Sequence, residues 1–262
     1  MTFNIKKTPG HNGLDHMKVS GTGGSMRAKV ASGSPPSIAT AGLILHLDAS
    51  NPTSYPGSGT TWYDLSANGN HAAMGVRTGG SNPTFTSDDG GGFTSFSTGY
   101  FDLSPNLRES YVSTGLSVFV WVKTQGNVSY HKIIERDDWG SPWGGWGLYY
   151  HYSNQAHGPH YVQSRSSTTL TNGNKYYIGF TISSGGTSKI YINGSLDGTD
   201  AGVTVPGAAS YSPFIGQTTD GAGGSNPYSW NGNIYEVHMY DRDLSDAEVL
   251  SNYNITKTRF GL

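Results

Sequence analysis

The spacing of apolar residues changes within residues 232–254, which read G-N-I-Y-E-V-H-M-Y-D-R-D-L-S-D-A-E-V-L-S-N-Y-N. The first half of this segment alternates with a period of two, which predicts a β-strand with two different faces. The apolar face is expected to hold Tyr235, Val237 and Met239, and the mixed face Glu236, His238 and Tyr240. The chain is therefore expected to build a sheet close to its end.

The second half of the segment predicts a short helix. Ser245 and Glu248 are three residues apart, the spacing of a capping box in which each side chain satisfies a backbone N–H at the start of a helix. Leu244, just before the cap, is expected to pack on Val249. Two to three turns are predicted, with the end near residues 255–256.

This strand and helix resemble the closing segment of the LamG-like jelly-roll domains, which belong to the concanavalin A-like lectin/glucanase group. The last strand of that family has roughly the pattern G-x-I-x-E-V-x-I-Y-N-R-x-L-S-x-x-E. Met239 and Asp241 are mild variants of it, and the matching positions are Gly232, Ile234, Glu236, Val237, Tyr240, Arg242, Leu244, Ser245 and Glu248. The resemblance implies a fold more than a function.

The beginning of the expected domain carries a second resemblance. LamG-like domains often open with an apolar strand and a W-x-D-L-S-G-N-G-like segment. Here the strand G-L-I-L-H-L-D-A-S starts at Gly42, with Leu43, Leu45 and Leu47 expected on one face. The segment after it matches at Trp62, Asp64, Leu65, Ser66, Asn68 and Gly69. The resemblance thus brackets residues 42–254.

Several strands are predicted between these brackets. Residues 116–123 alternate, with three valines on one face and Phe119 and Trp121 on the other, so both faces of this strand are expected to be covered. Ile178, Phe180 and Ile182 are expected to point inward, and Asn193-Gly194 suits a type I′ hairpin turn. About twelve strands follow from such patterns. We predict an all-β, two-sheet, concanavalin A-like jelly-roll sandwich with one short C-terminal helix and an extended N-terminal arm.

Composition excludes several classes of protein. The net charge is −2 and no basic run occurs, so the footprint of a nucleic-acid-binding protein is missing. The absence of cysteine excludes disulfides and thiolate metal sites. No apolar run is long enough for membrane insertion, and the first residues lack the apolar centre of a secretory signal.

Residues 1–41 differ in composition from the rest of the chain. Gly, Ser, Thr and Pro dominate, with scattered lysines, and the apolar content is too low for a core. Two interpretations stay open: a disordered leader, or an arm that orders only against a partner. We expect residues 1–41 to be a flexible or extended arm that anchors the chain in an assembly, and residues 42–262 to be the LamG-like jelly roll.

The same family contains glycoside hydrolases, which carry paired carboxylates. A retaining glycosidase needs two carboxyl groups about 5 Å apart, which in this family usually come from an E-x-D-x-x-E or E-x-D-x-E run. Glu135, in E-R-D-D-W, has no second glutamate at either spacing. We therefore predict that the chain is not an enzyme.

An aromatic segment at residues 136–161 supplies the candidate binding residues. Glycines and a proline surround its tryptophans, which indicates a loop, and indole faces suit the apolar faces of sugar rings. Sugar binding, a protein interface and plain packing all stay open. The candidate residues for glycan or interface contacts are Trp139, Trp143, Trp146, Asp137, Asp138, Asn154 and His157.

Metal sites are weakly indicated. His157 and His160 lack an obvious third zinc ligand. The family resemblance leaves calcium open, and its weak candidate ligands are Asp220, Asn226 and Asp102, with Asp48 as a further carboxylate. No metal or cofactor is otherwise predicted.

A lectin-type domain without cysteine or a secretory signal, preceded by a docking arm, resembles structural proteins of tailed bacteriophages. This resemblance implies a non-enzymatic virion protein, as a decoration, neck or fibre component, assembled in the host cytoplasm. Its expected partners are other virion proteins through the arm, further copies of itself, and host-surface or other polysaccharides. The alternatives are a free carbohydrate-binding lectin and a glycan-degrading enzyme.

Overall fold

The computed structural model describes residues 37–111, 113–126, 131–136, 145–151, 153–159, 164–217 and 228–262. The chain divides into two units at residue 36, and the description concerns the second unit, residues 37–262. The candidate residues Asp137, Asp138, Trp139, Trp143, Asp220 and Asn226 lie outside the described ranges.

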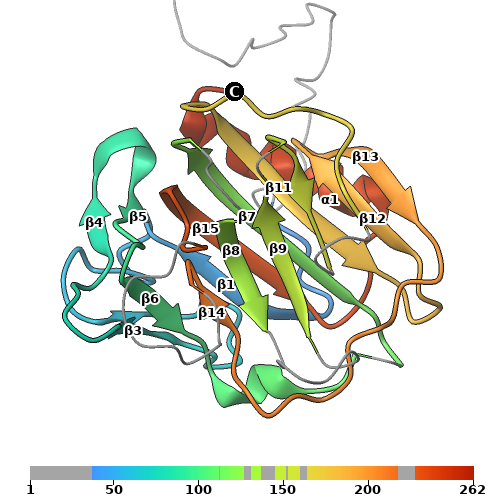
Figure 1. Cartoon of the computed structure of the whole chain (residues 1–262), viewed down its shortest axis with the longest axis horizontal. Helices are drawn as coiled ribbons and strands as arrows, with labels where there is room; N and C mark the ends of the chain where they lie inside the picture. Colours follow the sequence, from blue (N-terminus) through green and yellow to red (C-terminus); the bar gives the residue numbers. More distant parts are fainter. Residues whose placement is uncertain are drawn as a thin grey trace, which may run out of the picture. The chain divides into compact units, whose positions relative to one another are not determined.

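Eight strands form the first sheet, sheet A (Figure 1). Its order is β13–β12–β11–β7–β15–β5–β4, and β1 also pairs with β15. The bounds are β13 Ser195–Asp200, β12 Ser188–Ile192, β11 Lys175–Ile182, β7 Leu116–Thr124, β15 Gly232–Tyr240, β5 Gly92–Thr94, β4 Thr84–Thr86 and β1 Leu43–Asp48.

Seven strands form the second sheet, sheet B, in the order β10–β9–β8–β14–β6–β3–β2 (Figure 1). The bounds are β10 Ala156–His157, β9 Trp146–Tyr150, β8 His131–Arg136, β14 Phe214–Ile215, β6 Gly99–Asp102, β3 Ala72–Val76 and β2 Thr61–Trp62. All the described strand pairs are antiparallel. The helices are η1 Asp88–Gly90, η2 Pro105–Arg108, α1 Asp246–Thr256 and η3 Lys257–Phe260.

The main core lies between the two sheets. Phe93 of β5 packs on Trp62 of β2 and on Phe101 of β6, with ring centroids 4.8 Å apart in both pairs, and so joins sheet A to sheet B. The alternation predicted for β7 is confirmed, because its valines lie in this core while Phe119 and Trp121 lie on the other face. The predicted two-sheet jelly roll with one short C-terminal helix is confirmed.

Two β-bulges change the faces that simple alternation predicted. The pairing of β15 with β7 slips between Ile234 and Glu236, so Tyr235 turns to the outer face of sheet A and packs against Phe260. The pairing of β1 with β15 slips after Leu43, which also packs on the outer side. The expectation that Tyr235 and Leu43 point inward was therefore wrong, because an extra residue in one strand inverts the pattern on one side of it. Val237 and Met239 do point inward.

A second cluster of buried side chains covers the outer face of sheet A. We call it the outer cluster, and it consists of Phe119, Trp121, Tyr177, Tyr191, Tyr235, Tyr240, Leu244, Val249 and Phe260. Leu244 comes from the turn before α1, Val249 from α1 and Phe260 from η3, so these C-terminal elements cover this face. The predicted capping box is present, since the Ser245 hydroxyl accepts from the Glu248 N–H and the Glu248 carboxylate accepts from the Ser245 N–H. None of the described helices has the length and apolar character required to cross a lipid bilayer.

The loop of residues 64–70 satisfies the outer edge of β1. An edge strand leaves backbone groups that need partners. The His46 N–H donates to the Asp64 carboxylate over 2.9 Å, and the amides of Asn68 and Asn70 donate to the carbonyls of Leu43 and Ile44. The W-x-D-L-S-A-N-G-N segment is therefore an edge-capping loop, and its asparagines are held at fixed positions beside β1.

Candidate functional site

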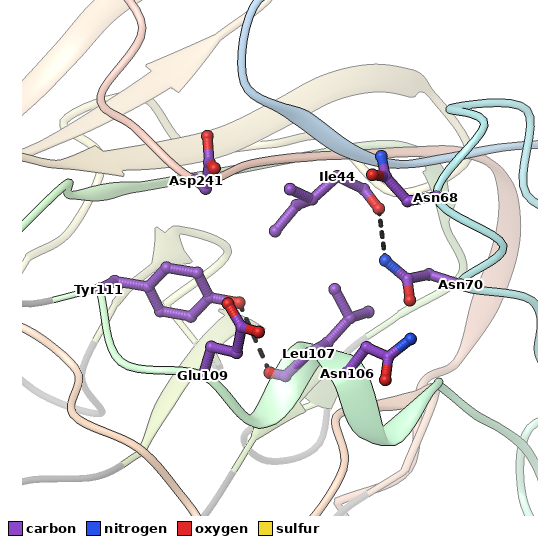
Figure 2. A pocket seen from close by; sticks show the side chains of 8 residues that line it. All are labelled: Ile44, Asn68, Asn70, Asn106, Leu107, Glu109, Tyr111 and Asp241. Atoms are coloured by element: carbon purple, nitrogen blue, oxygen red, sulfur yellow. Dashed lines mark hydrogen bonds between the residues drawn. The ribbon is translucent and has the colours of Figure 1, made fainter.

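A pocket opens beside this edge-capping loop (Figure 2). Its volume is about 330 Å³. The walls come from β1, the edge-capping loop, η2 with the segment that follows it, and the residue after β15. The lining residues are Ile44, Asn68, Asn70, Asn106, Leu107, Glu109, Tyr111 and Asp241. Segments distant in the sequence thus meet here on the rigid sandwich, as expected of a binding site.

Asn70 is the buried polar group of the pocket. Its side chain is 4% exposed, and its amide nitrogen donates to the Ile44 carbonyl over 2.8 Å. This bond fixes the orientation of the amide and directs the oxygen toward the η2 side of the pocket (Figure 2). The buried oxygen has no hydrogen-bond donor among the described residues. Buried acceptors are normally satisfied, and this one lies in the wall of the pocket without a donor among the described residues.

The rest of the pocket combines acidic, amide and apolar groups. Glu109 and Asp241 are exposed at its mouth, and no cationic side chain is among the described lining residues. Leu107 is buried and Ile44 is half-buried, which gives the pocket an apolar wall. Carboxylates and amides accept from hydroxyl groups, and an apolar wall suits C–H surfaces. The lining therefore fits a polyhydroxylated ligand.

Tyr111 closes one side of the pocket. The Arg136 guanidinium lies 5.4 Å from the centre of its ring, and its backbone N–H donates to the Pro206 carbonyl. Burial raises the pKa of the Tyr111 hydroxyl to about 12, with the nearby Glu109 and Asp241 carboxylates adding to the rise and Arg136 opposing it. The phenol is therefore neutral at physiological pH and serves as a hydrogen-bonding group.

Trp146, one of the three expected loop tryptophans, lies in the core. It is 1% exposed on β9 and packs edge-on against Phe180 of sheet A. The glycines and the proline around it predicted a loop, but Trp146 is the first residue of β9. Its indole is therefore not presented to a ligand.

Asn154 lies in the turn between β9 and β10, and His157 is the last residue of β10. Asn154 adopts a left-handed backbone conformation with φ of 59° and accepts from the Tyr150 hydroxyl, which fixes the turn before β10. His157 stacks on His151 with ring centroids 4.5 Å apart. His157 pairs directly with Tyr149, so both side chains lie on the outer face of sheet B. Neither residue contributes to the pocket of Figure 2.

The outer face of sheet B is polar and aromatic around these residues. Lys132 and Glu135 form a buried ion pair, and the Lys132 ammonium lies 5.0 Å from the centre of the Tyr149 ring. Phe214 of β14 stacks on Tyr100 of β6 on the same face. On this face aromatic rings therefore lie together with a buried ion pair.

Asp102 is the calcium candidate that lies within the described residues. It lies on β6, opposite Phe214, and partial desolvation of its carboxyl group raises the pKa above the ordinary value while Arg108 opposes the rise. Calcium needs six to eight oxygen ligands, usually with several carboxylates. No group of three acidic or histidine side chains forms around Asp102 among the described residues.

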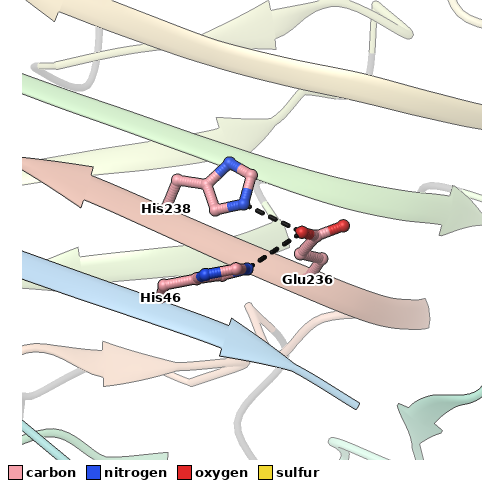
Figure 3. A group of neighbouring side chains, drawn as sticks. All are labelled: His46, Glu236 and His238. Atoms are coloured by element: carbon pink, nitrogen blue, oxygen red, sulfur yellow. Dashed lines mark hydrogen bonds and ion pairs between the residues drawn. The ribbon is translucent and has the colours of Figure 1, made fainter. Parts of the chain in front are cut away.

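The described residues do contain a cluster that sequence reasoning missed. His46, Glu236 and His238 converge on the outer face of sheet A (Figure 3). The nearest sequence signal is the E-V-H alternation of β15. His46 on β1 is 190 residues from Glu236 in the sequence, and the pairing of β1 with β15 brings the two side chains together.

Comparison with solved structures shows the same fold in proteins of low sequence identity. A sialidase of Trypanosoma rangeli is 16% identical with a TM-score of 0.58, over 86% of this chain and 35% of that chain. Domain 4 of the extracellular arabinanase AbnA of Geobacillus stearothermophilus, in complex with arabinotriose, is 16% identical with a TM-score of 0.58, over 81% of this chain and 98% of that chain. The binding domain of Paraclostridial Mosquitocidal Protein 1 is 13% identical with a TM-score of 0.55, over 81% of this chain and 52% of that chain.

These identities establish a shared fold only, and this chain spans about a third of the sialidase's length. No curated protein matches the sequence. A family match is nevertheless clear, since residues 95–250, more than half of the chain, match a single family and include the closing strand and capping box. The chain belongs to the concanavalin A-like lectin/glucanases superfamily.

Proposed function

We propose that residues 37–262 form a non-enzymatic carbohydrate-binding domain, and that the pocket beside the edge-capping loop is its glycan site. The observation that carries the proposal is the buried Asn70 amide oxygen, held in place by its bond to Ile44 and lacking a donor among the described residues. A sugar hydroxyl supplies such a donor. The arabinanase domain of similar fold, in complex with arabinotriose, supports a carbohydrate ligand for this superfamily fold.

The environment of two glutamates supports a binding role rather than catalysis. Glu236 accepts from His46 and His238 beneath the C-terminal helix, and Glu135 is paired with Lys132 and wholly buried. A glycosidase needs an acid and a nucleophile or base flanking an open subsite. Glu135 faces Lys132 and Glu236 faces two imidazoles, so neither carboxylate lies beside an open subsite in this arrangement.

A glycan array tests the binding role. The wild-type chain is expected to bind a set of glycans, and Glu109→Gln and Asn106→Ala to lose that signal while keeping the wild-type melting temperature, because both side chains are exposed. Asp243→Asn is the matched control, since this exposed carboxylate lies two residues from Asp241 but outside the pocket. An array without any hit, or binding unchanged in both pocket variants, would contradict the proposal.

We further propose that the domain is displayed on a bacteriophage virion and that the N-terminal arm, expected over residues 1–41, attaches it through the part that precedes residue 37. The support is the sequence resemblance to virion structural proteins and the low apolar content of this segment. The chain is expected at fixed stoichiometry in purified particles. Removing residues 1–36 is expected to leave the melting temperature of the jelly roll unchanged and to prevent incorporation. Normal incorporation of the shortened chain would refute the anchoring role, and absence from particles would favour a free lectin.

A further inference from the structure

The cluster of His46, Glu236 and His238 has the composition of a metal site. His46 on β1 stands directly opposite His238 on β15, and Glu236 is two residues before His238 on the same face. The Nε2 atoms of His46 and His238 lie 3.1 Å and 2.9 Å from the same Glu236 oxygen, Oε1 (Figure 3). The three ligand atoms lie within 4.8 Å of one another.

We propose that His46, Glu236 and His238 bind a divalent transition metal ion, with Zn²⁺ as the best fit. Two imidazoles and one carboxylate are a ligand set that zinc uses in proteins. Four-coordinate zinc with bonds of 2.0–2.1 Å separates its ligand atoms by about 3.3 Å. The two hydrogen-bonded separations are close to that value, and all three ligand atoms lie within 4.8 Å of one another, so the imidazoles must move closer together to hold the ion. Calcium fits poorly, because it selects oxygen ligands.

Residues around the cluster contact its side chains and orient them, as the outer hydrogen-bond partners of protein metal sites usually do. The Tyr177 hydroxyl lies 3.0 Å from His238 Nδ1 and can accept from an Nδ1–H, which leaves the Nε2 lone pair for the metal. The Arg259 guanidinium lies 3.7 Å from Glu236 Oε2, the carboxylate oxygen that faces away from the histidines. Arg259 is itself paired with Asp48, so these two charges balance.

Metal binding requires a change of protonation that the site can accommodate. In the hydrogen-bonded form each Nε2–H donates a hydrogen bond to the Glu236 carboxylate. In the metal-bound form each Nε2 has lost this proton and donates its lone pair to the ion. The proton of each imidazole moves to Nδ1, with exchange through solvent. His46 keeps 19% of its side chain exposed, so the ion and a fourth ligand, water, can approach from its side.

Metal binding to the full-length chain tests this inference. Calorimetric titration with ZnCl₂ is expected to give one ion per chain in the wild type. The His46→Gln variant removes the most accessible ligand and is expected to weaken zinc binding by roughly 100-fold or more, since even loss of an outer partner costs about 10–100-fold. His71→Gln, which changes an exposed histidine outside the cluster, is the matched control and should bind as the wild type does.

A spectroscopic measurement on the wild type guards against misfolding of the variant. Co²⁺ is expected to give the strong visible bands of a tetrahedral site, and Zn²⁺ to abolish them at one equivalent. Long-range ¹H–¹⁵N spectra should then show two histidines bound through Nε2. Absence of tetrahedral cobalt bands, or zinc affinity unchanged in a folded His46→Gln chain, would overturn the inference and leave the cluster as a hydrogen-bonded structural network.

Discussion

The side-chain amide of Asn252 on α1 donates a hydrogen bond of 2.9 Å to the hydroxyl of Tyr240 on β15, and both side chains are fully buried. The oxygen of the same amide accepts from the backbone N–H of Ala39 over 2.8 Å. One asparagine therefore ties the C-terminal helix both to the closing strand and to the segment that precedes β1.

Asn252→Ala is expected to destabilise the domain strongly. The substitution leaves the Tyr240 hydroxyl and the Ala39 N–H without this partner, and a buried polar group that loses its partner costs about 1–3 kcal/mol. Denaturant unfolding measures the loss as a lower transition midpoint. Asn254→Ala, at an exposed position of the same helix, is the control and should match the wild type within about 0.5 kcal/mol. Equal stability of the two variants would refute the role of Asn252.

Val237→Asp tests the assignment of faces on β15. Val237 is fully buried in the core between the sheets, so the substitution buries a carboxylate without a partner. We expect a loss on the order of 3 kcal/mol or more in the free energy of unfolding. Leu196→Asp is the matched control on β13, where the leucine is 45% exposed and the charge stays in water. A soluble Val237→Asp chain with the wild-type melting temperature would show that the faces are reversed.

The start of α1 gives the domain a dependence on acid pH. Hydrogen bonds from the Arg242 guanidinium lower the pKa of the Glu248 carboxyl from 4.5 to about 2, although partial burial opposes the shift. A carboxyl group with a lowered pKa in the folded state stabilises the fold fully above its unfolded pKa. The stabilisation is lost as the pH falls from about 4.5 toward 2.

Glu248→Gln isolates this contribution from those of other acidic groups, such as Asp246, whose pKa is also lowered by hydrogen bonds from Lys189 and Tyr191. The difference in unfolding free energy between wild type and variant is expected to be constant near neutral pH and to shrink toward zero between about pH 5 and pH 2. Unfolding curves at several pH values measure it. A difference independent of pH would mean that the Arg242–Glu248 pair is not formed in solution.

The aromatic segment between β8 and β9 contains Trp139 and Trp143, which the sequence offers as candidates for glycan or interface contacts. We expect the double substitution to alanine to leave the melting temperature unchanged, because loop tryptophans carry little core packing. It should weaken binding of the glycans found on the array. Full binding by the double variant would remove this segment from the site and leave the pocket beside the edge-capping loop on its own.

Alternation predicted the core of the fold well. The inward residues of β7 and β11 lie where the period of two places them, and the turn at Asn193-Gly194 has positive φ at both positions, as a type I′ turn requires. These are local properties, set by side chains a few residues apart. The two β-bulges were missed because an extra residue in a strand leaves no trace in the alternation until the partner strand is known.

The sites depend on contacts between distant segments, which explains why the sequence did not reveal them. Asn70 belongs to a segment that looks like a simple turn, and its importance comes from the β1 carbonyl that it reaches. His46 and Glu236 are 190 residues apart and meet only because the first and last strands pair. Trp146 shows that a local pattern can also mislead, because its glycine-rich surroundings predicted an accessible loop and the residue is a buried part of β9.

The central claim is that glycans bind in the pocket around Asn70, and NMR titration tests it most directly. The chain is titrated with a glycan identified on the array, and the side-chain amide of Asn70 and the methyl groups of Ile44 and Leu107 are observed. We predict that these signals shift in a saturable manner, while the methyl groups of the exposed, remote Leu196 do not. Saturable shifts confined to the outer face of sheet B, at Tyr149 and its neighbours, with Asn70 unchanged, would contradict the account.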